Sequence, residues 1–125
     1  MSKVKVLQAA TTIAKTTQTL IGEVIDTGHY SFLSLFFTYV KGDETGLIVQ
    51  AHMLTTAAGT AYQDQSWSTA AGTKTHTLNQ FTASNGVPHA ITFDVRGIPF
   101  VKFTQGGSNN DGTPTGTLAA TYALK

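Results

Sequence analysis

The sequence predicts an all-β protein, a single antiparallel β-sandwich of about eight strands with a jelly-roll-like arrangement. Three observations indicate this fold. Segments rich in aromatic and β-branched residues recur about every 8–12 residues, with turn signals between them. No segment sustains the 3.6-residue period of an amphipathic helix. The chain has 125 residues, of which 41% are hydrophobic, enough for one domain with a core of its own.

The N-terminal residues are predicted to be extended. Residues 4–7 alternate apolar side chains with lysine, which is a short strand pattern. In residues 9–19 the alanines favour a helix, but the repeated threonines favour a strand, and we interpret the segment as extended. We therefore divide the chain into an extended arm, residues 1–18, and a sandwich domain, residues 19–125.

The first strands of the sandwich follow. Residues 20–26 predict a strand, with Gly22 as a possible bulge. Residues 26–28, Asp-Thr-Gly, predict a turn. The most informative stretch is residues 30–53, which we interpret as two long strands joined in a hairpin by the polar tip at residues 41–46.

The first strand of this hairpin is apolar on both faces. A period of two gives one face that consists of Leu33, Leu35, Phe37 and Tyr39. The opposite face consists of Tyr30, Phe32, Phe36 and Val40. We expect this strand to be covered on both sides, by the sandwich interior and by an oligomer interface.

The middle of the chain carries weaker patterns. Residues 62–68 and residues 74–81 are predicted strands, the second of them exposed. Residues 55–61 and 70–72 are rich in small residues and predict loops. Residues 84–86, Ser-Asn-Gly, are a strong turn signal because Asn-Gly readily adopts a positive φ.

The last third is again clearly β. Residues 88–95 alternate, and the inward positions are Ile91, Phe93 and Val95. Residues 98–104 predict a strand that begins near Pro99, and residues 106–112 predict a flexible loop. Residues 113–124 close the chain, with Leu118, Ala120, Tyr122 and Leu124 on one face.

Composition excludes several classes of function. Only 12% of the residues are charged, about half the usual share, and the net charge is +1 without a basic stripe. Binding to nucleic acid through phosphates therefore has little support. No cysteine is present, which excludes disulfides, zinc–thiolate sites and cysteine catalysis. The sequence shows no apolar run of about 20 residues and no signal-peptide pattern at its start, so we expect a protein that is made in the cytoplasm and has no membrane partner.

The polar motifs do not indicate catalysis, a cofactor or a metal. The four histidines lack close metal-ligand spacing. The spacing of residues 108–112 does not match a calcium loop, and Ser66-Trp67-Ser68 is not a nucleophile elbow. Asp43 and Glu44 lie at the predicted hairpin tip, where a carboxylate pair lacks the cleft that acid–base work requires. We interpret them as a solubilising turn, or alternatively as an anchoring contact to a partner.

Two other groups of residues are candidates for partner binding. An extended Thr-rich arm can add to the exposed sheet edge of a neighbour, and its apolar residues are Val4, Val6, Leu7 and Ile13. Tyr62 and Trp67, with the loop at residues 106–112, suggest an aromatic surface that stacks against sugars. Phe100 is a third candidate for this surface, and core packing is the favoured role for at least two of the three aromatic residues.

Several stretches together resemble a known group of proteins. They are YSFLSLFFTYVKGDETGLIVQ, which begins at Tyr30 and follows Gly28 and His29, then TAYQDQSW, IPFVKFTQ and GTLAATYAL. This order resembles small β-sandwich proteins encoded among the virion genes of tailed bacteriophages. The resemblance covers about residues 19–124, and its motif is a folding pattern rather than a catalytic signature.

The resemblance implies a non-enzymatic virion protein, foremost a capsid decoration or cement protein on the capsid surface, made in the host cytoplasm. Its partner would be the major capsid protein or another virion protein, bound in many copies. We expect a homo-oligomer, with a trimer favoured, and no nucleic acid, membrane or cofactor. The alternatives are a head–tail or tail component, or a carbohydrate-binding host-attachment module.

Overall fold

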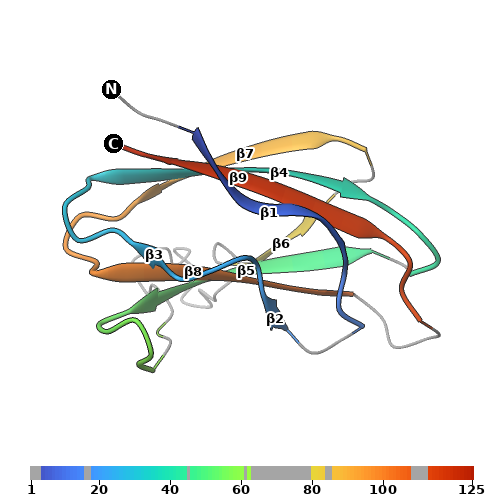
Figure 1. Ribbon diagram of the computed structural model, residues 1–125, viewed down its shortest axis with the longest axis horizontal. Coiled ribbons are helices and arrows are strands. Elements are labelled where there is room, and N and C mark those ends of the chain that lie inside the picture. Colours follow the sequence, from blue (N-terminus) through green and yellow to red (C-terminus); the bar gives the residue numbers. More distant parts are fainter. Residues whose placement is uncertain are drawn as a thin grey trace, which may run out of the picture.

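The structure, a computed structural model, is built from β-strands in two antiparallel sheets. It describes residues 4–15, 18–44, 46–60, 62, 80–83, 86–107 and 113–125. Its strands are β1 (Val4–Thr12), β2 (Thr19–Leu20), β3 (Ile25–Asp26), β4 (Phe32–Val40), β5 (Leu47–Leu54), β6 (Gln80–Ala83), β7 (Pro88–Asp94), β8 (Phe100–Gly107) and β9 (Thr117–Leu124). The two sheets form separate layers (Figure 1).

The strand order is that of a jelly roll. One sheet has the order β1-β9-β4-β7, and the other has the order β2-β8-β5-β6, with β3 also paired to β8. The first half of the chain pairs with the second half in reverse order: β1 with β9, β2 and β3 with β8, β4 with β7, and β5 with β6. A long antiparallel hairpin rolled into two layers gives this nesting, so the predicted all-β sandwich is confirmed.

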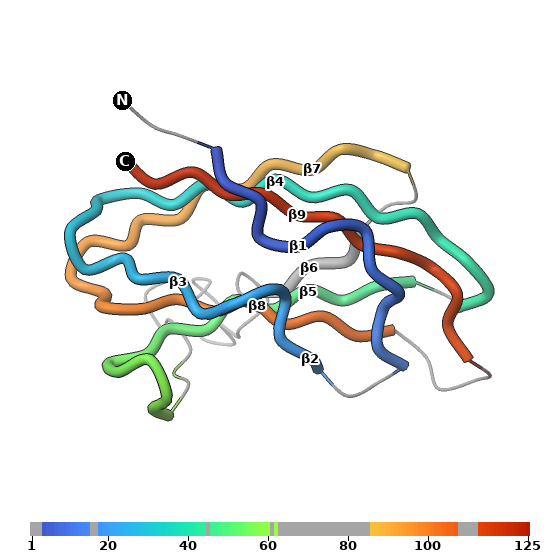
Figure 2. The backbone as a smooth tube through the Cα atoms, in the orientation of Figure 1, coloured from blue at the N-terminus to red at the C-terminus, as the bar shows by residue number. Residues whose placement is uncertain are grey.

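The expected count of about eight strands holds because β2 and β3 act as one interrupted strand. Both run antiparallel to β8, but their registers differ by two residues. Gly22 lies in the interruption with φ 63°, and a Cβ there would collide with the carbonyl of Leu7. The bend between β2 and β3 is visible beside β8 in Figure 2. The bulge predicted at Gly22 is therefore present.

The core lies between the layers and uses the inward positions of nearly every strand. Phe93 of β7 and Phe103 of β8 meet across the layers, with ring centroids 5.4 Å apart. The buried set includes Leu33, Leu35, Phe37 and Tyr39 of β4, together with Leu118, Ala120 and Tyr122 of β9. These are the faces that the period of two predicts. Ile91 is partly buried against this core, whereas Phe93 and Val95 are fully buried.

The predicted hairpin at residues 30–53 is wrong. Its two strands, β4 and β5, belong to different sheets, so residues 41–46 cross from one layer to the other. An alternating pattern shows that two strands exist but not which strands they pair with. Here β4 pairs with β7 and β9, while β5 pairs with β6 and β8, and those partners come from far along the chain.

The N-terminal segment is extended, as expected, and from Val4 onward it is a strand of the sandwich. β1 pairs with β9 through two register irregularities and forms one edge of the four-stranded sheet. Leu7 and Ile13 from this segment are buried in the core. The backbone of Ile13 donates to Gly116, and the Ala14 amide donates to the buried Gln105 side chain. Residues 4–14 are therefore joined to the sandwich by core packing as well as by pairing.

Other predicted segments either have different bounds in the structure or lie outside the described residues. β8 runs from Phe100 to Gly107, so Gly106 and Gly107, predicted in a loop, are buried strand residues that pair with β5. The predicted strands at residues 62–68 and 74–81 lie mostly outside the described residues. Of the first, Tyr62 forms an isolated bridge with Met53.

Candidate binding surface

The outer face of the four-stranded sheet is the main exposed apolar surface of the described structure. On β4 the outward side chains of Phe36 and Val40 are 37% and 54% exposed, and on β1 that of Val6 is 71% exposed. Phe32 and Val4 extend the same face. We expected a cover on this side of β4, and within the single chain the described residues leave it open to solvent. We call this surface the outer face.

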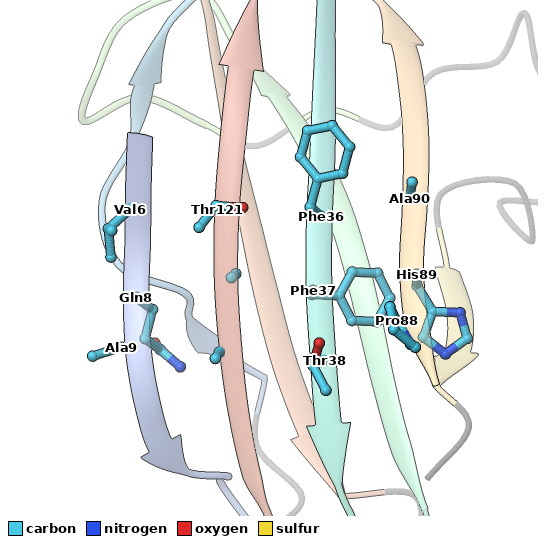
Figure 3. Close-up of a pocket in the computed structure, with 12 residues that line it drawn as sticks. Val6, Gln8, Ala9, Phe36, Phe37, Thr38, Pro88, His89, Ala90 and Thr121 are labelled. Atoms are coloured by element: carbon cyan, nitrogen blue, oxygen red, sulfur yellow. The ribbon is translucent and has the colours of Figure 1, made fainter. Parts of the chain in front are cut away.

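The outer face is hollowed into a shallow groove of about 460 Å³. Side chains from all four strands line it, in the order β1, β9, β4 and β7 (Figure 3). Its members share small or apolar character: Val6, Ala9, Phe36, Pro88, Ala90 and Thr121. The polar Gln8 also borders the groove, but its amide nitrogen donates to the Leu118 carbonyl and its oxygen accepts from the Gly22 amide.

The sheet beneath the groove is stabilised on its core-facing side by ring stacking. Phe37 and His89 pair across β4 and β7, and their rings stack with centroids 4.9 Å apart at 19°. Next to them Ser34 and Thr92 are hydrogen-bonded through their hydroxyl groups at 2.8 Å. The outer face therefore presents hydroxyls and apolar groups on a fixed frame.

One end of the outer face carries a group of charged residues. Asp94 ends β7, and Arg96 follows it with an ion pair of 2.5 Å. The Arg96 guanidinium also lies 5.7 Å from the centre of the Phe32 ring. Lys125 lies at this end too, where its backbone pairs with that of Phe32. The Arg96 hydrogen bonds hold the pKa of Asp94 at about 2, so the acid is ionised at neutral pH.

Asp43 and Glu44 do not form a projecting tip together. Asp43 is exposed, but Glu44 is only 2% exposed. One Glu44 oxygen accepts from the Tyr39 hydroxyl and from the Gly42 amide at 2.8 Å. The other accepts from the amides of residues 115 and 116 at 3.1 and 2.9 Å. The carboxylate thus ties the connection between the sheets to the segment that enters β9, and it is a structural anchor.

The ionisation of Glu44 follows from these contacts. Burial opposes the charge, but the hydrogen bonds from Tyr39 and from the backbone amides outweigh it and hold the Glu44 pKa at about 2. The pKa of Tyr39 is raised, because its hydroxyl is buried and donates to this carboxylate. Both groups are buried, and their oxygen atoms are engaged in hydrogen bonds within the chain.

The residues proposed for partner binding therefore separate into three groups. Val4 and Val6 lie on the outer face and are exposed. Leu7, Ile13 and Glu44 are buried within this chain: Leu7 is the buried residue of β1, Ile13 directly follows that strand, and the Glu44 carboxylate is anchored. Asp43 and Tyr62 are exposed but lie away from the outer face, and Trp67 lies outside the described residues.

The proposed sugar surface loses part of its basis. Tyr62 is exposed, but Gly106 and Gly107 belong to β8 rather than to a loop. Among the described residues, no group of three or more His, Asp or Glu side chains is placed to hold a metal ion. The same residues contain no helix long and apolar enough to cross a membrane.

Sequence reasoning assigned β4 its two faces but missed the groove. Pro88 and Ala90 were interpreted only as strand residues, and Ala9 as part of the arm. Their meeting depends on β7 and β1 being placed on either side of the β9–β4 pair, which is a long-range arrangement. The second apolar face of β4 did indicate an interaction surface on this side, but it could not show which strands flank β4 there.

Comparisons with known proteins support the fold. The chain is similar to the crystal structure of the SPBc2 prophage-derived protein YomS, with a TM-score of 0.57 and 12% identity over 99% of this chain and 92% of that chain. It is also similar to a protein from a structure described as Bacillus endospore appendages that form a family of disulfide-linked pili, with a TM-score of 0.53 and 9% identity over 99% and 85% of the two chains. No family model and no curated protein sequence matches the chain.

Proposed function

We propose that this chain is a non-enzymatic structural component of a tailed-phage virion, a capsid decoration or cement protein that binds the major capsid protein through the outer face. The observation that carries the proposal is the uncharged apolar centre of that face, with Phe36 and Val6 open to solvent at the groove. An apolar surface that is exposed on a rigid sheet is typical of a protein interaction site. The fold likeness to a prophage-derived protein supports the particle context.

Stabilisation of the shell in this way requires only that surface is buried between the two proteins, without a chemical reaction. Each copy that seats its outer face on the shell removes apolar area from water, at about 25 cal/mol per Å². A copy that bridges two capsid subunits must be released before those subunits can separate, so its contacts add to the cost of disruption. The low charge of the centre favours this role, because no buried charge has to be stripped of water when the face is covered.

Co-sedimentation tests the proposal. The purified chain is mixed with empty heads of the phage that encodes it, and the bound fraction and the melting temperature of the heads are measured. We expect saturable binding and a higher melting temperature. The Phe36→Asp variant should bind at least tenfold more weakly, because it places a charge at the centre of the buried face.

The control is Ala57→Asp, which adds the same charge in the exposed turn after β5. It should bind like the unmodified protein, provided that both variants keep the native circular dichroism spectrum. Equal binding by all three proteins would remove the outer face from the contact. Absence of binding by the unmodified protein would remove the decoration role.

A second candidate is a subunit of a tail or another appendage. It is favoured by the fold likeness to a protein of pilus-forming appendages. Such a subunit binds copies of itself or of a tail protein rather than the shell. Immunogold labelling of whole virions distinguishes the two: labels along the tail support the appendage role, and labels over the head support decoration.

A further inference from the structure

The geometry points to a second interaction element, the free edge of β7, and we infer that it pairs antiparallel with β7 of a second copy about a two-fold axis at Ile91. The inference concerns the chain alone and does not depend on the proposed function. β7 is the last strand of the four-stranded sheet, and only β4 pairs with it among the described residues.

The alternation of hydrogen bonds along β7 shows which of its backbone groups point away from β4, towards the free edge of the sheet. The Val95 amide donates to the Ser31 carbonyl at 2.9 Å, and these two residues continue the β4–β7 register. In an antiparallel pair, residues that exchange hydrogen bonds alternate with residues that do not. His89, Ile91 and Phe93 therefore bond to β4, whereas the backbone N–H and C=O groups of the even-numbered residues point away from it.

The hydrogen bonds of β4 confirm that the odd-numbered residues of β7 bond to β4 and that the even-numbered ones face away. Phe32 exchanges backbone hydrogen bonds with Lys125 at 2.9 and 3.0 Å, so the even-numbered residues of β4 bond to β9 and the odd-numbered ones to β7. The hydroxyl contact between Ser34 and Thr92 also fits, because side chains lie closest in pairs that do not exchange backbone bonds. The Ala90, Thr92 and Asp94 amides thus have no backbone partner within the described residues.

The edge of β7 carries the usual devices that block pairing only at its two ends, Pro88 and Asp94. Natural edge strands are protected by bulges, by charges or by proline. β1 at the opposite edge has two register irregularities, whereas β7 keeps one register with β4 over all seven of its residues. Between Pro88 and Asp94 it carries no charged side chain and no glycine. An edge as regular as this one is suited to another strand.

A second copy is the occupant because the edge is self-complementary. With Ile91 opposite Ile91 of the second copy, Ala90 faces Thr92 and Pro88 faces Asp94. Every outward amide then donates to a carbonyl of the second copy. Pro88, which has no N–H, contributes only its carbonyl, which accepts from the Asp94 amide of the second copy. The two Asp94 carboxylates lie at opposite ends, so like charges do not meet.

Ile91 gives the pairing an apolar centre. It is only partly buried in the single chain and packs against the rim of the core. The two-fold places the two isoleucines side by side on the inner face, and β-branched cross-strand pairs stabilise antiparallel sheets. The product is one continuous sheet of eight strands, and the pairing is two-fold rather than the trimer favoured from the sequence.

Cysteine cross-linking tests the axis directly, since the chain has no cysteine of its own. In the proposed register the two Ile91 Cα atoms lie about 4.5 Å apart, within the range of a disulfide. The two Thr92 Cα atoms are offset to about 8 Å, beyond that range. Under mild oxidation Ile91→Cys should therefore give a covalent dimer, and Thr92→Cys, although more exposed, should give little.

Light scattering supplies the second measurement. The unmodified chain should have a mass of about 26 kDa, twice its own 13.2 kDa. Ala90→Pro removes one outward amide and should shift the protein to the monomer with its circular dichroism retained, whereas Ala90→Ser keeps the amide and the dimer. A monomeric unmodified chain, or equal cross-linking at positions 91 and 92, would overturn the inference. Preferred cross-linking at position 92 would overturn the proposed axis.

Discussion

Replacement of Glu44 by glutamine is the most revealing single change in the fold. The carboxylate of Glu44 accepts four hydrogen bonds: from the Tyr39 hydroxyl and from the amides of Gly42, Thr115 and Gly116. Glutamine keeps the size of the side chain but replaces one acceptor oxygen with an NH₂ donor. Two of the four donors then face another donor in a buried place, where an unsatisfied polar group is costly.

The size of the effect follows from the pKa. Folding lowers the Glu44 pKa from 4.5 to about 2. By linkage, this preference for the charged form contributes about 3 kcal/mol to the free energy of unfolding at neutral pH. We therefore expect Glu44→Gln to lower that free energy by about 3 kcal/mol, which is a large share of the stability of a domain of this size.

Urea denaturation at several pH values checks both the size and the cause. Because the folded pKa is depressed, the contribution is complete above about pH 5 and is lost as the pH falls towards 2. The difference between the unmodified protein and Glu44→Gln should therefore shrink by about 2 kcal/mol between pH 7 and pH 3. Asp43→Asn, at the exposed neighbour, should show no such difference. A Glu44→Gln deficit that is the same at pH 7 and pH 3 would refute the reasoning.

Three other changes test the described packing by urea denaturation. Leu7→Ala should lower the free energy of unfolding by about 3 kcal/mol, whereas the exposed Val6→Ala should change it by less than about 0.5 kcal/mol; equal effects would contradict the placement of β1. Gly116→Ala should lower the free energy of unfolding by about 2 kcal/mol or more, because the added Cβ would lie 2.8 Å from the Val40 carbonyl and against Glu44. An unchanged free energy would mean that this contact can relax. Tyr39→Phe should lower the free energy of unfolding by about 2 kcal/mol, because it removes a hydrogen bond to a charged group. An unchanged free energy would indicate that water replaces the hydroxyl.

The sequence was sufficient for the fold class and for the inward faces. Leu33, Leu35, Phe37 and Tyr39 were assigned to one face by their period alone, and they are buried together. The same is true of the last strand, β9, and of the bulge at Gly22. These features are local, because alternation and glycine chemistry act within a few residues.

Features that depend on distant partners were missed. The connection at residues 41–46 has the polar, glycine-containing character of a hairpin tip, but it crosses between layers. The amides that hold Glu44 in this crossing belong to Thr115 and Gly116, more than 70 residues further along the chain. Likewise, β1 was interpreted as an arm because nothing in residues 1–18 reveals that β9 will pair with it. A jelly roll joins the two ends of its chain, so local patterns cannot reveal its pairing.

The outer face and the edge of β7 belong to the same sheet, and this decides how the two proposals combine. Four strands spaced about 4.8 Å apart and about 24 Å long give the outer face a footprint of about 450 Å². A standard interface buries about 800 Å² on each partner. The outer face of a single copy therefore offers about half of the area that a stable complex requires. Pairing through β7 places two outer faces side by side in one sheet, with a joint footprint of about 900 Å². If both proposals hold, the Ala90→Pro monomer should bind heads more weakly than Ala90→Ser, although both variants change the same residue of the groove. Equal binding would mean that each copy binds the head alone.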